Sequence, residues 1–140
     1  MTSALRFTAA ALASVCILAP IAIHAQAPTP KPERVQFAKG TSSKIIKGSI
    51  KGDRSRLFLI NVRAGQTLKV KLVSSNASAN FNLTAPGAAQ ALFIGSTSGS
   101  DFEGVVPSSG DYKIDLFLMR NAARRNETAN FTLTIGVTGR

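Results

Sequence analysis

Three arginines gather in a short polar stretch near the end of the sequence, from Arg120 to Glu127. A guanidinium is always charged and can bind a carboxylate through two parallel hydrogen bonds. If the stretch makes one helical turn, Arg120 and Arg124 lie on the same face because they are four residues apart. The pattern therefore predicts a protruding basic loop suited to carboxylates. The alternative is that these are solvated loop charges, which is the preferred interpretation for Arg125.

Asp101 and Glu103 are the only acidic near neighbours outside a predicted strand face. A spacing of two places both side chains on one side of an extended chain. A carboxylate pair can hydrolyse a glycosidic bond, but no other feature of the sequence supports glycosidase chemistry. We therefore expect that the protein is not an enzyme.

The N-terminal region has the pattern of a secretory signal peptide. Arg6 is followed by an apolar run from Phe7 to Ile23, and the predicted cleavage follows Ala25, so the signal peptide spans residues 1–25. A membrane anchor is the alternative, because the run approaches the ~20 residues that span a bilayer. Lipid attachment at Cys16 is disfavoured because Val15 before it is too large.

Cleavage would remove Cys16 and His24, the only cysteine and the only histidine of the chain. The exported protein would then have no disulfide, no thiol nucleophile, no Ser-His-Asp triad and no Cys/His zinc site. We expect no catalytic residue, no metal and no cofactor.

The chain is strongly basic, with 17 Lys and Arg against 7 Asp and Glu and a formal net charge of +10. Of the basic residues, only Arg6 lies in the predicted signal peptide. Such a balance favours polyanions, anionic lipid or a protein with an acidic cleft as partners. Nucleic acid is disfavoured, because the chain is exported and has no Trp and a single Tyr to stack on bases.

The rest of the sequence predicts one all-β domain, residues 35–140, after a Pro-rich linker at residues 26–34. Apolar residues alternate with polar ones in short runs separated by Gly and Pro turns, and no stretch has helical periodicity. The fold class is an antiparallel β-sandwich of about eight or nine strands. Residues 56–62 should be a central strand, residues 95–100 a flexible turn, and the last two strands a hairpin that carries the basic loop. The predicted strands are 35–37, 44–52, 56–62, 67–73, 80–84, 91–94, 102–106, 111–118 and 131–137.

Several short motifs of this domain resemble the periplasmic inhibitors of goose-type (g-type) lysozyme. The most distinctive is the Arg-Asn-x-Ala-Arg loop after the penultimate strand, here Arg120 to Arg124. Some of the shorter pieces also occur in the bacterial pre-peptidase C-terminal sandwich domains. The pieces that carry the resemblance are residues 35–43, 48–52, 64–66, 86–87, 107–112 and 120–125.

The resemblance implies that the protein inhibits g-type lysozyme by inserting the arginine loop into its active-site cleft, and so protects bacterial peptidoglycan in the periplasm. It implies no membrane span after signal cleavage, and a homodimer is an open option. In the family the loop after Ile-Lys-Gly usually adds an aromatic side chain, whereas this chain has Asp53 and Arg54 there. The Ser-Gly-Asp-Tyr element either shapes a turn or contacts the enzyme, and for Tyr112 we expect packing with its hydroxyl bonded. The lysozyme-binding residues implied are Arg120, Arg124, Asn121, Arg125, Asp53, Arg54, Ser109, Gly110, Asp111 and Tyr112.

The main alternative is a non-enzymatic envelope domain of the pre-peptidase type that binds glycan or polyanion. It would use lysines spread over the strands rather than the arginine loop, and its binding would weaken with salt. The candidate lysines are Lys44, Lys47, Lys51, Lys69 and Lys71.

Overall fold

The computed structural model describes residues 20–23, 26 and 28–139. Most of the predicted signal peptide lies outside these residues. Within the part that the structure describes, no helix has the length and hydropathy needed to cross a membrane.

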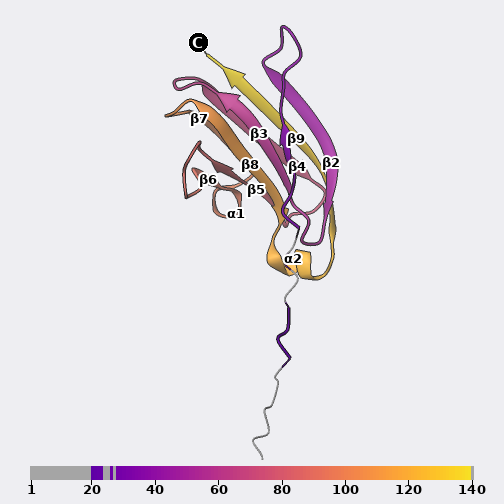
Figure 1. The fold of residues 1–140 in the computed structure, drawn as a ribbon. Coiled ribbons are helices and arrows are strands. Elements are labelled where there is room, and N and C mark those ends of the chain that lie inside the picture. Colours follow the sequence, from indigo (N-terminus) through magenta and orange to yellow (C-terminus); the bar gives the residue numbers. More distant parts are fainter. Residues whose placement is uncertain (1–19, 24–25, 27, 140) are drawn as a thin grey trace, which may run out of the picture.

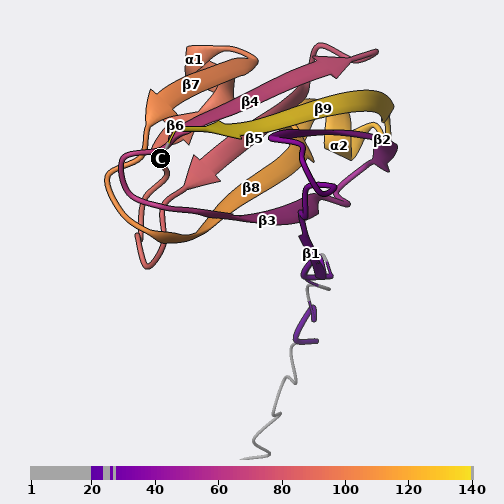
Figure 2. The ribbon, with the colours of Figure 1, turned by 90° about the horizontal axis from the view of Figure 1, so that it is seen from above.

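The described chain folds into two sheets packed face to face, as predicted for an all-β sandwich (Figures 1 and 2). In spatial order, the first sheet contains β1 (Pro32–Arg34), β3 (Arg56–Val62), β8 (Gly110–Leu118), β5 (Ala79–Thr84) and β6 (Phe93–Ile94). The second sheet contains β2 (Ser43–Lys51), β9 (Thr128–Thr138), β4 (Thr67–Ser74) and β7 (Asp101–Val105). Two short helices complete the described elements, α1 (Gly95–Ser98) and α2 (Arg120–Arg124).

The core lies between the sheets and follows the period-2 alternation of the sequence. In β4, Leu68, Val70 and Leu72 are buried, whereas Lys69 and Lys71 between them are exposed. Residues 56–62 were expected to form a central strand; β3 is flanked by β1 and β8, but the middle strand of its sheet is β8. The other large, fully buried side chains include Phe58, Phe81, Leu83, Tyr112, Ile114, Leu116, Leu133 and Ile135.

The predicted first strand is wrong in position. Residues 35–37 are not a strand, and β1 instead lies within the predicted linker and pairs in parallel with β3. Proline is tolerated at the first residue of an edge strand, where no ladder hydrogen bond is lost. Two ion pairs hold β1 to the sheet, Arg34 with Asp111 at 2.7 Å and Glu33 with Arg56 at 2.7 Å.

The predicted final hairpin is also wrong, because β8 and β9 belong to different sheets. β8 pairs with β3 and β5, and β9 pairs with β2 and β4. The chain therefore crosses from one sheet to the other between Leu118 and Thr128. Alternation shows which face of a strand is buried but does not identify the partner strand.

Two connections contain helical turns that no periodicity predicted. α1 lies in the segment expected to be a flexible turn, and α2 lies in the basic loop. One helical turn over Arg120–Arg124 is the conformation that would place the two arginines on one face. The tight turn after β3 contains Gly65 at φ 88°, a conformation that glycine adopts without steric cost.

Candidate functional site

The connection between β8 and β9 is a single helical turn closed at both ends by backbone hydrogen bonds. The Ala123 N–H donates to Met119 O at 2.9 Å, and the Met119 N–H donates to Ser78 O at 2.8 Å. Asn126 follows the helix at φ 55°, the left-handed conformation that commonly ends a helix, and its N–H bonds to Ala123 O. The backbone of this turn is therefore fixed on both sides.

Two small side chains anchor the turn to the core. Ala122 is completely buried, and Ala123 packs against the core while partly exposed. Because these residues face inward, Arg120, Asn121 and Arg124 project to the solvent. α2 is thus a rigid platform with its polar side outward.

The charges of the three arginines are balanced differently. Among the described residues, neither Arg120 nor Arg124 has a hydrogen-bond or ion-pair partner for its guanidinium. Arg125, in contrast, donates from Nε to Glu127 Oε1 at 2.6 Å. Two of the three loop cations are therefore free to bind a partner, and the third is already paired.

Glu127 joins three segments at this end of the molecule. Its Oε2 accepts a hydrogen bond from Asn76 Nδ2 at 2.8 Å, and its backbone carbonyl accepts one from the Gly52 N–H at 2.9 Å. The Glu127 N–H donates to Ala122 O at 3.1 Å. The hydrogen bond from Asn76, followed by that from Arg125, holds the pKa of Glu127 below its usual range. Sequence analysis did not identify Glu127 or Asn76, because the bond between them spans two distant loops.

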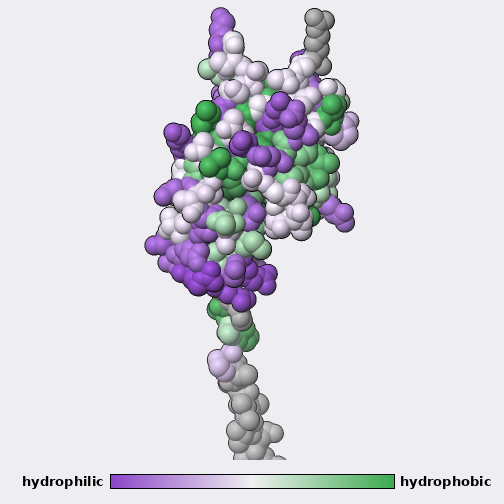
Figure 3. Space-filling model, turned by 180° about the vertical axis from the view of Figure 1, so that it is seen from behind, coloured by the Kyte–Doolittle hydropathy of each residue, from purple (hydrophilic) through white to green (hydrophobic). Residues whose placement is uncertain are grey.

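The turn between β2 and β3 lies beside α2 at the same end (Figure 1). Gly52 adopts φ 61°, and a Cβ there would lie 2.7 Å from Asn126 Oδ1. Asp53 and Arg54 follow and are both exposed, lining a shallow hollow together with Lys51 and Asn126. Seen from behind, hydrophilic residues gather at this lower end of the domain (Figure 3).

The Ser-Gly-Asp-Tyr element lies at the opposite end of β8. β8 contains nine residues, so its two ends lie eight steps apart, or about 26 Å at roughly 3.3 Å per step. Tyr112 is fully buried, and its hydroxyl donates to Ser108 O at 2.8 Å, which confirms the predicted inward packing. Ser109 Oγ accepts a hydrogen bond from the Ala64 N–H at 2.8 Å.

Asp111, in the same element, is held by other parts of the fold. Arg34 donates to both its oxygens, at 3.0 and 2.7 Å, and Asn61 donates to one of them at 3.1 Å. The pKa of Asp111 is lowered to about 2, first by Arg34 and then by Asn61. Before Asp111, Gly110 has φ 140° and leaves no room for a Cβ, which would lie 2.8 Å from Pro86 Cγ. The predicted contact residues thus form two separate groups, and this one is engaged within the fold.

Asp101 and Glu103 line an open hollow over β4 and β7 together with Lys69 and Lys71. Both are exposed on β7, and Glu103 Oε1 is paired with Lys69 Nζ at 3.0 Å. No cluster of three potential metal ligands occurs among the described residues.

Comparisons with known proteins identify relatives of this chain. The inhibitor of g-type lysozyme from Escherichia coli strain K12 is 30% identical over 106 residues, which cover 74% of this chain and 78% of that protein. The chain belongs to this inhibitor family. The crystal structure of Aeromonas hydrophila PliG, a periplasmic inhibitor of g-type lysozyme, matches with a TM-score of 0.71 and 36% identity, covering 76% of this chain and 96% of that one.

Another PliG structure and a more distant relative of the fold also match the chain. Salmonella Typhimurium PliG matches at a TM-score of 0.61 and 29% identity, covering 79% of this chain and all of that one. The pre-peptidase C-terminal domain of Bacillus anthracis collagenase, at 17% identity and a TM-score of 0.55 over 81% of this chain, shares the fold. No protein-family model matches the sequence.

Family membership confirms the resemblance predicted from the motifs. The named members are inhibitors and not enzymes, in agreement with the expected absence of catalysis. They are described as periplasmic, which is the location predicted for this chain.

Proposed function

We propose that this protein inhibits g-type lysozyme by inserting α2 into the active-site cleft of the enzyme. One observation carries the proposal: Arg120 and Arg124 project from a single anchored turn, and neither guanidinium has a partner among the described residues. Lysozymes cut glycan chains with carboxylates that flank the scissile bond. Arg120 and Arg124 would bind these carboxylates and block access of the substrate.

The anchoring of α2 favours tight binding. A loop that is already ordered loses little conformational entropy when it binds, so more of the contact free energy appears as affinity. Buried Ala122 and the hydrogen bonds of Glu127 supply that order here. The two arginines then meet the enzyme without a prior rearrangement of the loop.

Neighbouring residues would extend the contact around α2. Asn121 lies on the same exposed side, and Arg54 and Asp53 stand on the adjacent turn. Met119, which is 41% exposed, offers an apolar surface at the start of the helix. In this proposal Arg125 contributes less, because Glu127 already neutralises it.

The group at the far end of β8, Ser109 to Tyr112, would act through the fold. Its side chains hold β1, the turn after β3 and the start of β8 together. We also propose that residues 1–25 are a cleaved signal peptide, and that the inhibitory domain includes β1.

The test is a titration of g-type lysozyme with the protein recovered from a periplasmic extract, followed as residual lysis of a cell-wall suspension. The proposal predicts loss of lysis near a one-to-one ratio. It also predicts that oligomers of N-acetylglucosamine, which occupy the cleft, compete with the inhibitor. Full lysis at excess protein would refute inhibition, and inhibition that is indifferent to the oligomers would refute binding in the cleft. Chicken-type and invertebrate-type lysozymes serve as specificity controls.

A further inference from the structure

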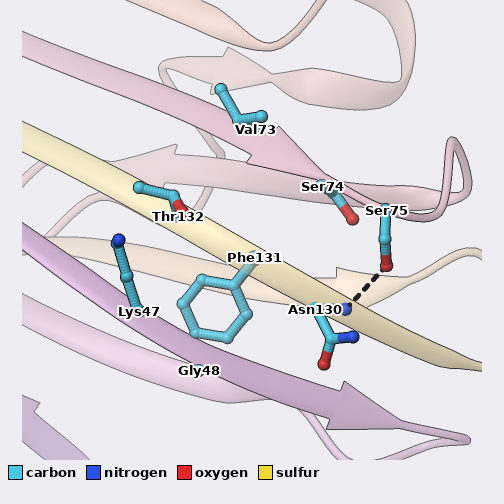
Figure 4. Close-up of a pocket in the computed structure, with 8 residues that line it drawn as sticks. All are labelled: Lys47, Gly48, Val73, Ser74, Ser75, Asn130, Phe131 and Thr132. Atoms are coloured by element: carbon cyan, nitrogen blue, oxygen red, sulfur yellow. Dashed lines mark hydrogen bonds between the residues drawn. The ribbon is translucent and has the colours of Figure 1, made fainter.

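The outer face of the second sheet presents a regular arrangement of cationic, aliphatic and hydroxyl side chains. The strand register places Ile45, Thr134 and Lys71 in one row across β2, β9 and β4. The next row contains Lys47, Thr132 and Val73 (Figure 4). Lysines and aliphatic residues therefore alternate diagonally around two threonines.

The lysines on this face differ in whether an acidic residue lies near them. Lys47, Lys51 and Lys71 form no ion pair with any described residue, whereas Lys69 is paired with Glu103. The two acids of this sheet, Asp101 and Glu103, lie on the edge strand β7. In the strand register, Asp101 lies opposite Lys71 and Glu103 lies opposite Lys69. Positive charge still predominates on this face, because Lys47 and Lys51 on β2 have no acidic residue across from them.

The aliphatic residues of this face are among the most exposed in the domain. Ile45 is 62% exposed and Val73 is 57% exposed, while the threonine side chains between them are short. Figure 3 looks onto this side of the molecule, and hydrophobic and hydrophilic residues are interspersed over it. A water-facing sheet would carry polar residues at these two positions.

We propose that this face binds the surface of an anionic lipid bilayer. Lysines attract the headgroups of anionic lipids, at about 1 kcal/mol for each lysine near the surface. Aliphatic side chains placed between them enter the boundary between headgroups and acyl chains. A soluble polyanion would satisfy the lysines but would leave Ile45 and Val73 in water, so the combination favours a lipid surface.

The centre of the proposed membrane face, at Ile45, Lys47, Lys71 and Val73, is separate from the proposed lysozyme site on α2, and Lys51 lies at the border between the two. α2 lies beyond the ends of the strands, whereas the membrane face is the outer surface of the second sheet (Figure 1). A protein lying on the membrane by this face would keep Arg120 and Arg124 accessible. The inference therefore stands or falls independently of lysozyme inhibition.

The first test is co-sedimentation of the protein with lipid vesicles. The protein is purified from the periplasm, and its N-terminus is determined by mass spectrometry. Vesicles containing phosphatidylglycerol are compared with vesicles of phosphatidylcholine alone. A Lys47→Gln/Lys71→Gln variant should partition about 30-fold less, since each lysine contributes about 1 kcal/mol, or roughly fivefold. The matched control is Lys39→Gln/Lys113→Gln, which removes the same charge from exposed positions elsewhere.

The second test uses single tryptophan reporters, because the chain has no Trp. Val73→Trp should shift its emission to shorter wavelength on anionic vesicles. Ile94→Trp, at a 44% exposed position on the other sheet, should not shift. Equal loss of binding in the two lysine pairs, an unshifted Val73→Trp spectrum on bound protein, or binding to peptidoglycan or heparin but not to vesicles would overturn the proposal.

Discussion

Asn76 donates a hydrogen bond from Nδ2 to Glu127 Oε2 over 2.8 Å, although the two residues are 51 positions apart. This bond joins the loop between β4 and β5 to the segment between α2 and β9. The other carboxylate oxygen of Glu127 binds Arg125. Glu127 therefore holds the C-terminal end of the loop that contains α2 and neutralises Arg125, one of the three arginines of that loop.

Replacing Glu127 should weaken lysozyme binding without direct contact to the enzyme. Glu127→Ala frees the end of α2, so the loop must be ordered on binding, and the dissociation constant should rise several-fold. Asn76→Ala removes the other end of the same bond. The double variant should therefore bind lysozyme no more weakly than the single variant with the lower affinity. Calorimetric titration of lysozyme with each variant measures the dissociation constants. If the two substitutions lower the binding free energy additively, the bond does not position α2.

Enlarging Ala122 should displace α2. The side chain is completely buried, and overpacking a core site typically costs about 1–3 kcal/mol. Ala122→Leu should lower both the melting temperature and the affinity for lysozyme. Asn121→Ala, on the exposed side of the same turn, should keep the wild-type melting temperature. An Ala122→Leu protein that melts like wild type would contradict the anchoring role.

Removing the hydroxyl of Tyr112 should affect stability alone. Tyr112→Phe deletes the bond to Ser108 O, and a typical hydrogen bond contributes about 1 kcal/mol. Because Tyr112 is buried at the end of β8 away from α2, the inhibition constant should stay unchanged. A loss of affinity in a protein that remains folded would instead place this element in the contact with the enzyme.

Asp111 should contribute to acid sensitivity. Its pKa is lowered to about 2 in the folded protein, against about 3.9 for an unperturbed Asp, so the folded state binds its proton less readily. Its stabilising effect is complete above about pH 4 and is lost as the pH falls through about 2. Between pH 5 and pH 2, the melting temperature of wild type should fall more steeply than that of Asp111→Asn. Parallel curves would show that the Arg34 contact does not stabilise the fold.

Local alternation predicted the faces of the strands well. The alternation of apolar residues in β4 and β5 matches their buried face, and the inward packing of Tyr112 was predicted, because burial of one face imposes a period of two. It failed for strand pairing, as β8 and β9 show, because the same alternation suits any partner. It also missed β1, whose short Pro-containing segment is held by side chains distant in sequence, Asp111 and Arg56.

For the candidate site, the sequence predicted the residue types but not the hydrogen bonds and ion pairs that hold them in place. Arginines at a spacing of four predicted a shared face, and the structure has a helical turn there. The pairing of Arg125 with Glu127 and the bond from Asn76 depend on how loops from three parts of the chain meet. No local sequence pattern predicts contacts between loops that are distant in the chain.

The dissociation constant of the complex with g-type lysozyme, measured for an Arg120→Gln/Arg124→Gln variant, tests the central claim most directly. The matched control is Lys39→Gln/Lys113→Gln, which lowers the net charge equally at exposed positions away from α2. Truncating one partner of a buried charge pair costs about 2–5 kcal/mol. The arginine variant should therefore bind at least about 30-fold more weakly, and the lysine control should bind like wild type. Equal affinity in the two variants would show that α2 does not carry the inhibition.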